Sequence, residues 1–409
     1  MAMMTGLTAF SVLMGRDYCG PTGLPPALMV ILLAPSGAGK EEPKQMARHL
    51  MRVMNREDKL GSDEFGSGQG VEREICEKSE VLYLQDEFAD YLATVARPNC
   101  PAYKRDIVKI LKTVQSGNKY SGRALKNAGE TCSVDEPRVG LVSLAQPVPF
   151  WSNISDGVIT DGFLGRFITL TAAHLEVDAT RRPKPASQCM PPAIKEFCEA
   201  AAASVGKTGP MAVLSRGANG PKTTRIQIGF KDKSATDFER DFFIQNRTEF
   251  NRLTMQRLSV EPALIGRSYE NMLKLATVYA WTETPDASKL AVSREALEWA
   301  ATIIRASERC VAVAMTDGGS NEESDQKRWK TYERIIRTAT DSPYKGIQVS
   351  VLMARARYGK VYHENIIKQM IAAKVIAVSH GRRGGAYVRW IGDEAREYDE
   401  PEEREALPA

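Results

Sequence analysis

The sequence predicts an α/β protein built on a parallel sheet. Three apolar runs of strand length, ALMVILLA (27–34), EVLYLQDE (80–87) and RVGLVSLAQ (138–146), have the nearly continuous apolar character of strands buried on both faces. Between them, KQMARHLMRVM and KRDIVKILKTVQSG have apolar residues at helical spacing. Strands that alternate with helices in this way are typical of a doubly wound sheet.

Composition divides the rest of the chain into segments. A helical segment, LTAFSVLMG, precedes the first strand, and the prolines of RRPKPASQCMPP indicate a linker. A strongly helical region follows, and then two helices and a hairpin with a GRRGG tip, the order of a winged helix-turn-helix. We expect five segments: a core (1–180), a linker with a core extension (181–232), a helical lid domain (233–318), a winged helix (328–392) and an acidic disordered tail (393–409).

Charge and cysteine content exclude several classes of protein. A net charge of +4 is too small to indicate a nucleic-acid partner by itself, so any basic surface must be local. The seven cysteines include no CxxC pair, which argues against a structural zinc site and favours a reducing cytoplasm. The longest apolar run, 27–34, is too short to cross a bilayer, and the N-terminus lacks the basic region of a secretion signal.

The stretch LLAPSGAGKEEP (32–43) lies between a predicted strand and a predicted helix, where a phosphate-binding loop occurs. Consecutive backbone amides there would form an anion nest, and Lys40 would place a positive charge near the β- and γ-phosphates. The predicted nucleotide-binding residues are Ser36, Gly37, Ala38, Gly39, Lys40 and Glu41. An ordinary surface loop is the alternative, and Ala34 replaces the usual first glycine.

Glu41 stands where a serine or threonine hydroxyl usually ligates Mg²⁺. Two alternatives stay open from the sequence. The Glu41 carboxylate ligates Mg²⁺, or it occupies the first turn of the helix, where the helix dipole favours a negative charge.

Two adjacent acids end the run EVLYLQDE. At the tip of a strand beside the loop, Asp86 would hold Mg²⁺ directly or through water, and Glu87 would orient and polarise an attacking water. The alternative is that these acids only begin the helix predicted over DEFADYL.

These motifs, together with NKYSGR (118–123) and SDGVITDGFLGRF (155–167), resemble the helicase-type P-loop ATPases of phages and other mobile elements, which are often joined to or found with a primase-polymerase. The likeness covers about residues 5–310. It implies an AAA+/RecA-like core, a superfamily-3-like ring of six subunits, ATP and Mg²⁺ as cofactors, and single-stranded, forked or duplex DNA as partner. Because no primase domain fits ahead of residue 27, a separate primase or polymerase is expected.

The resemblance also assigns roles to single residues. Arg166 in GFLGRF would reach the neighbouring subunit's site and stabilise charge on the γ-phosphate, although a surface arginine is the alternative. Gln146, or else Ser143, would position the lytic water, and Arg267 would contact the phosphates from the lid of the same subunit. Some relatives of this group carry an acid after the loop lysine, and by that resemblance Glu41 would be a family trait.

Basic loops are the predicted DNA contacts. A motor tracks a strand by positive groups that read phosphates, and the loop after 117 offers such charges beside the ring of Tyr120. The hairpin tip of the C-terminal unit would reach the backbone in the same way. The DNA-binding residues expected are Lys119, Arg123, Lys126, Arg382 and Arg383. A solvated loop and a protein-docking module are the alternatives.

Taken together, the sequence predicts an ATP-driven DNA translocase or replicative helicase that acts as a ring. An initiator or loader scaffold that binds ATP with little hydrolysis is the second hypothesis. A P-loop kinase is a weaker one, because it leaves GFLGRF, the lid and the winged unit without a role.

Overall fold

The structure, a computed structural model, describes most of the chain. The described residues are 1–96, 100–116, 120–122, 133–154, 162–172, 190–204, 226–256, 260–284, 286, 288–316, 322–341, 346–356, 360–380 and 386–391. The chain divides into two compact units, Met1–Ala312 and Val313–Ala409. Each unit is described by itself.

The centre of the first unit is a parallel sheet. In the described part of the chain it has four strands in the order β3-β6-β2-β7. They are β2 (Met29–Leu33), β3 (Glu80–Gln85), β6 (Arg138–Ala145) and β7 (Ile168–Thr171). Every residue of β2 and β6 is buried, as the continuous apolar runs predicted. The α/β class with a parallel sheet is therefore confirmed.

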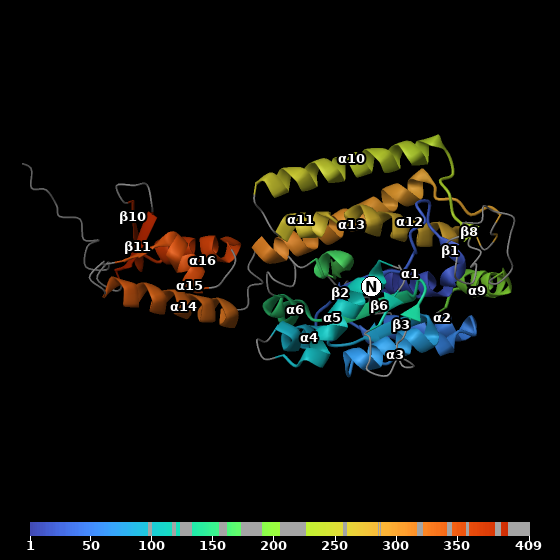
Figure 1. Cartoon of the computed structure of the whole chain (residues 1–409), viewed down its shortest axis with the longest axis horizontal. Coiled ribbons are helices and arrows are strands. Elements are labelled where there is room, and N and C mark those ends of the chain that lie inside the picture. The colour runs from blue at the N-terminus through green and yellow to red at the C-terminus, as the bar shows by residue number, and fades with distance from the viewer. Residues whose placement is uncertain are drawn as a thin grey trace, which may run out of the picture. The chain divides into compact units, whose positions relative to one another are not determined.

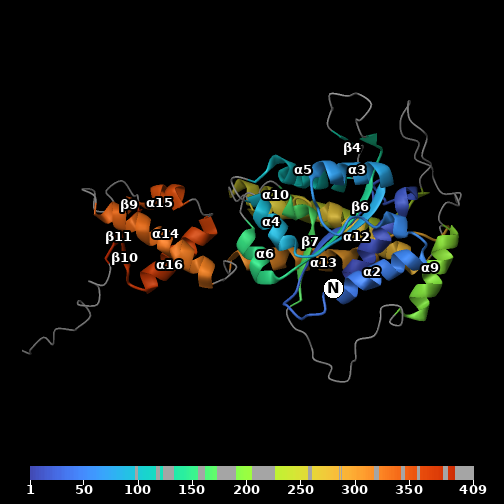
Figure 2. The same ribbon diagram turned by 90° about the horizontal axis from the view of Figure 1, so that it is seen from below.

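Helices cover this sheet on two sides. Figure 2 shows α3 and α5 on one side of the strands and α2 and α9 on the other. The bounds are α1 (Ala2–Leu13), α2 (Glu41–Val53), α3 (Gly68–Lys78), α5 (Ala102–Gln115) and α9 (Pro192–Ser204). Helix α1 lies so close to β6 that a Cβ on Gly140 would stand 2.6 Å from Val12 Cγ2 and 3.3 Å from the Thr8 carbonyl oxygen. Glycine is the residue type that permits this approach.

Shorter elements connect the sheet to its helices. Among the described residues, β1 pairs with β8 in parallel and β4 pairs with β5 antiparallel. The bounds are β1 (Tyr18–Cys19), β4 (Tyr120–Ser121), β5 (Ser133–Val134), β8 (Ile226–Gln227), α4 (Phe88–Ala96), α6 (Pro147–Asn153), and the 3₁₀ turns η1 (Gly15–Asp17), η2 (Glu57–Lys59) and η4 (Leu164–Arg166).

A helical layer completes the first unit (Figure 1). Its helices are α10 (Lys233–Met255), α11 (Val260–Ile265), α12 (Ser268–Glu283) and α13 (Arg294–Thr316). Helix α12 is buried along most of its length, and its Trp281 packs against the rings of Phe10 and Phe197. This aromatic contact joins the helical layer to α1 and α9 in one hydrophobic core.

The second unit has its own core, which includes Tyr332, Ile336, Leu352, Met370 and Val388. Its elements are α14 (Glu322–Thr340), β9 (Ile347–Gln348), α15 (Val349–Ala356), α16 (Lys360–Ala372), β10 (Ile376–His380) and β11 (Ala386–Trp390). The strands form an antiparallel sheet in the order β10-β11-β9. Two helices followed by a hairpin are thus present in the predicted order.

Two further findings concern the class of protein. No helix in the described part of the chain combines the length and the apolar character needed to cross a bilayer. Cys19, Cys100, Cys198 and Cys310 are free, whereas Cys76 is disulfide-bonded. The disulfide was not expected from the scattered cysteines, which had favoured a reducing compartment.

Candidate functional site

The predicted phosphate-binding loop runs from the end of β2 to the start of α2. Its glycines have left-handed backbone angles, with φ of 78° at Gly37 and 71° at Gly39. The turn is closed by two bonds, from Ala38 N to the Pro35 carbonyl oxygen (3.3 Å) and from Glu42 N to the Gly39 carbonyl oxygen (3.2 Å). Within the described residues, the amides of Gly37, Gly39 and Lys40 donate to no protein oxygen. Unpaired amides at a helix N-terminus are what an anion nest requires.

The strand order brings this loop to the same edge of the sheet as two other predicted site segments. Strand β6 lies between β2 and β3, and all three are parallel. Their carboxyl ends therefore lie together, and Leu33 is paired in register with Ala145, the residue before Gln146. In parallel sheets the carboxyl edge, where the strand order reverses, is where ligands bind. The loop, Gln146 and Asp86 share that edge.

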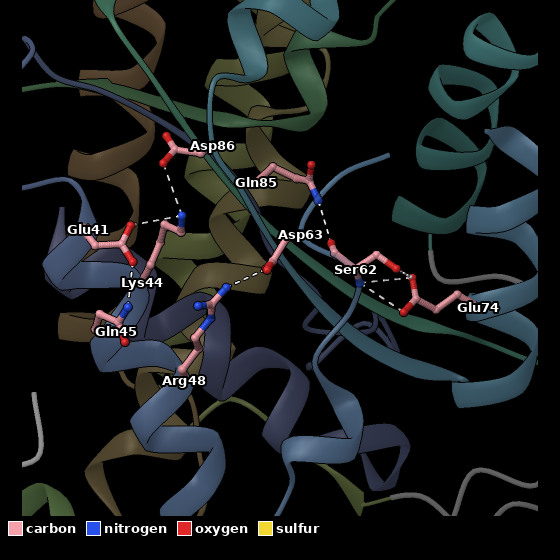
Figure 3. A network of polar contacts seen from close by, with 9 residues as sticks. All are labelled: Glu41, Lys44, Gln45, Arg48, Ser62, Asp63, Glu74, Gln85 and Asp86. Carbon is pink, nitrogen blue, oxygen red and sulfur yellow. Dashed lines mark hydrogen bonds and ion pairs between the residues drawn. The ribbon is translucent and has the colours of Figure 1, made fainter. Parts of the chain in front are cut away.

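Lys44 joins the loop side to the acid side of the site (Figure 3). Its ammonium nitrogen lies 3.2 Å from Glu41 Oε2 and 3.2 Å from Asp86 Oδ2. The side chain of Lys44 is 11% exposed, whereas those of Glu41 and Asp86 are about half exposed. Burial lowers the pKa of Lys44, but the two carboxylates outweigh burial and raise the pKa above its ordinary value. The lysine therefore stays charged between two carboxylates.

Both carboxylates are oriented by a second donor. Gln45 Nε2 donates to Glu41 Oε1 at 2.7 Å, and the backbone N of Glu87 donates to Asp86 Oδ1 at 3.1 Å. One oxygen of each acid is thus occupied, and the other faces Lys44. Glu41 does lie in the first turn of α2, as one of the two alternatives held, and it also contacts a cation there.

Glu87 has an unusual backbone conformation. Its φ is 48°, in the left-handed region that non-glycine residues rarely adopt. Its side chain is exposed and forms no ion pair in the described part of the chain. Helix α4 begins at the next residue, so the acids do precede a helix, and the Glu87 carbonyl oxygen accepts from Asp90 N at 2.9 Å. Backbone strain of this kind often accompanies a functional position.

A polar cavity of about 500 Å³ lies beside these acids. Two contacts fix side chains of its lining: Arg48 pairs with Asp63 at 2.6 Å, and Gln85 Nε2 donates to the Ser62 carbonyl oxygen at 2.9 Å (Figure 3). The lining residues are Lys44, Arg48, Asp63, Glu64, Phe65, Gln85, Asp86, Glu87, Phe88, Asp90, Tyr91, Thr94 and Lys104. None of the loop residues 34–40 lines it, so the cavity lies against α2 and the end of β3 and does not contain the loop.

The other predicted polar residues lie at different places. Gln146 is exposed at the tip of β6 and begins α6. Ser143 is buried inside β6, and its hydroxyl has no hydrogen-bond partner within the described chain. Because Ser143 lies within the strand, Gln146 is the better placed of the two for a role at the sheet edge.

The two arginines assigned from the resemblance are not brought to the loop. Arg166 lies in η4, and its Nη1 donates to the Gly162 carbonyl oxygen at 2.5 Å. Arg267 precedes α12 and pairs with Glu270 at 2.8 Å. Among the described contacts, none joins either arginine to residues 34–40 or to Asp86. A trans role for Arg166 needs a second subunit, which this single chain does not contain.

A buried polar network links these arginine-bearing segments to α5. Lys274 is fully buried, pairs with Glu270 at 2.9 Å and donates to the Gln115 carbonyl oxygen at 2.7 Å. Burial raises the pKa of Glu270, but Lys274 and Arg267 outweigh burial and hold it below its ordinary value. This network was not expected from the sequence. Its signal was Lys274 as the one charged residue of the mostly apolar stretch MLKLATVYAW (272–281).

Asn271 extends the network to the turn that carries Arg166. Its Nδ2 donates to the Gly165 carbonyl oxygen at 3.0 Å, and its Oδ1 accepts from Gln115 Nε2 at 3.4 Å. Helix α12 therefore holds the end of α5 and the η4 turn at once.

The predicted DNA contacts are outside what the structure describes. Lys119, Arg123, Lys126, Arg382 and Arg383 all lie outside the described residues. Tyr120 is described, and it is buried where β4 pairs with β5. Its expected role as an exposed stacking ring is therefore wrong for this conformation.

Glu41 and Asp86, the two acids that contact Lys44, are the candidate metal ligands of this site. Within the described residues, no group of three or more histidine, cysteine, aspartate or glutamate side chains is arranged to hold a metal ion. A metal ion held by Glu41 and Asp86 would complete its shell with oxygens from other sources.

Neither a family model nor a curated protein matches the chain.

Proposed function

We propose that the chain is an ATPase that binds ATP at the loop 34–40 and couples hydrolysis to movement along single-stranded DNA. The observation that carries the proposal is the double contact of Lys44. It places the start of the helix after the loop and the tip of β3 within reach of a single cation. A nucleotide site needs this meeting of phosphate loop and acidic strand tip.

In this proposal the residues of the candidate site have separate roles. The unpaired amides of Gly37, Gly39 and Lys40 bind phosphate oxygens, and the Lys40 ammonium adds charge. Glu87, exposed beside Asp86, accepts a proton from the attacking water. Gln146, between the two segments at the sheet edge, orients that water.

Magnesium fits the donor set of this site. Glu41 and Asp86 are carboxylates, hard oxygen donors that Mg²⁺ prefers, and they already share one cation, the ammonium of Lys44. When bound, Mg²⁺ supplies charge neutralisation at the β- and γ-phosphates.

The larger architecture in this proposal is a ring, of six subunits, with an AAA+/RecA-like P-loop core, a lid formed by α10–α13 and a C-terminal winged helix. The order α15, α16, β10, β11 supports the winged helix. Arg166 acts in trans on the γ-phosphate of the neighbouring subunit.

The test is ATP turnover with and without single-stranded DNA. We expect DNA to stimulate phosphate release, Glu87→Gln to lower it by about 10²–10⁴-fold, and Arg166→Ala to lower it by about 10³-fold or more. Mixing the two inactive variants should restore part of the activity, because some interfaces then combine an intact Glu87 with an intact Arg166. Lys289→Ala, which changes an exposed lysine on a loop, is the matched control. Unchanged turnover in both site variants would refute the assignment.

One observation favours a second function, an initiator or loader scaffold that binds ATP with little hydrolysis. Lys44 already neutralises the two acids that would hold Mg²⁺. If it stays there when ATP binds, the metal has no place and hydrolysis is slow. Tight ATP binding without phosphate release would identify this function, and Glu41→Ser should then raise turnover.

A further inference from the structure

The Lys44 ammonium lies between two carboxylates, those of Glu41 and Asp86, and each carboxylate is held in place by a second hydrogen-bond donor. Gln45 fixes one oxygen of Glu41 and the Glu87 amide fixes one oxygen of Asp86. The two remaining oxygens each lie 3.2 Å from the Lys44 nitrogen, so they are separated by no more than twice that distance. The arrangement uses all four carboxylate oxygens and leaves none of them facing solvent without a donor.

An ammonium group and a divalent cation compete for these two oxygens. A magnesium ion approaches carboxylate oxygens to about 2.1 Å, which is closer than the nitrogen of an ammonium group can approach them. With Lys44 in place, a metal ion would meet an adjacent positive charge and lose the two donors it needs.

The Lys44 side chain has space to move away from the two acids. The cavity of about 500 Å³ beside it is lined by Lys44 itself and by further carboxylates, among them Asp63, Glu64 and Asp90. A lysine side chain can swing on its four-carbon stem into such a space and find a new acceptor there.

We propose that Lys44 is a resident counter-ion that holds the cation position between Glu41 and Asp86 in the nucleotide-free protein, so that a divalent cation enters only together with nucleotide. The entry of the divalent cation together with nucleotide rests on the proposed function. The role of Lys44 as a counter-ion does not, because it concerns metal binding to the nucleotide-free protein. Lys44 is a positioning residue here, since it acts by controlling access to the two acids.

The experiment measures Mn²⁺ binding to the nucleotide-free full chain by electron paramagnetic resonance of the free ion. Wild type should bind Mn²⁺ weakly. Lys44→Met and Lys44→Gln each remove the charge and should tighten binding of one ion by about tenfold or more. The gain should disappear in Lys44→Met/Asp86→Asn. Lys78→Met, which removes a lysine paired with Glu74 on α3 at 3.0 Å, is the matched control and should behave as wild type.

Two outcomes overturn the proposal. Either the Lys44 variants bind Mn²⁺ no more tightly than wild type, or the gain survives Asp86→Asn, which places the ion elsewhere. Two neutral variants guard against a folding defect in one of them, and circular dichroism checks both.

A parallel titration of wild type with a fluorescent ATP analogue in the presence of Mg²⁺ separates the two proposals. If the Lys44 variants gain Mn²⁺ binding but the protein binds no nucleotide, the counter-ion role of Lys44 stands and the proposed ATPase function is refuted. If the protein binds nucleotide but the Lys44 variants gain no Mn²⁺ binding, the ATPase function stands and the counter-ion role is refuted.

Discussion

Replacement of Lys274 by methionine tests whether the buried network under α12 stabilises the first unit. Methionine has nearly the same length but no charge, so the change removes the ion pair with Glu270 (2.9 Å) and the hydrogen bond to the Gln115 carbonyl oxygen (2.7 Å). Losing one member of a buried ion pair costs about 3–5 kcal/mol when the other is left alone. Glu270 retains Arg267 at 2.8 Å, and the ammonium no longer has to be desolvated. We therefore expect a loss of about 2 kcal/mol.

Urea denaturation followed by tryptophan fluorescence measures this loss, with Trp281 in the same helix as reporter. The pair is isolated by a double-mutant cycle with Glu270→Gln, for which we expect a coupling of about 1–2 kcal/mol. Lys289→Met, an exposed lysine paired with Asp286 at 3.4 Å, is the matched control and should change stability by less than about 0.5 kcal/mol. Additive effects of Lys274→Met and Glu270→Gln, or a loss no larger than that of Lys289→Met, would show that the buried pair does not stabilise the first unit.

Three other predictions follow from single residues. Gly140→Ala should destabilise the protein by about 1–3 kcal/mol in thermal unfolding, because the new Cβ would clash with α1. Gly6→Ala is the control and should not destabilise the protein, because a Cβ on Gly6 of α1 would meet no atom within 4 Å. Glu87→Gly should raise stability by about 1 kcal/mol by relieving the left-handed φ of 48°, while Glu87→Gln leaves stability unchanged, and both should lose hydrolysis. Folding lowers the pKa of Glu270, so this carboxylate contributes its full stabilisation above the ordinary pKa of 4.5 and loses it as the pH falls through the lower pKa of the folded state. In Glu270→Gln, the urea concentration at the unfolding midpoint should therefore depend less on pH in that range than it does in wild type.

The sheet could be predicted from the sequence because its strands are buried on both faces. Continuous apolar runs such as 29–33 are typical of strands buried on both faces, and the glycines after that run mark the turn to a helix. The same local logic predicted the two helices and the hairpin of the second unit.

The role of Lys44 could not be predicted in the same way. Read along the chain, EEPK is an ordinary first helical turn in which Lys44 faces Glu41. Asp86 is 42 residues away in sequence and is brought to Lys44 only because β3 and β2 flank β6. Lys274 was missed for a similar reason, since its acceptor on Gln115 is a backbone carbonyl oxygen, which has no sequence signature.

Nucleotide binding by loop 34–40 is measured by equilibrium titration of wild type and Lys40→Ala with a fluorescent ATP analogue. Loss of one charged phosphate contact is worth about 1.5–3 kcal/mol, so we expect Lys40→Ala to bind about 10- to 100-fold more weakly than wild type and Lys289→Ala to bind as wild type does. Equal binding by wild type and Lys40→Ala, or no binding by wild type, would contradict the account.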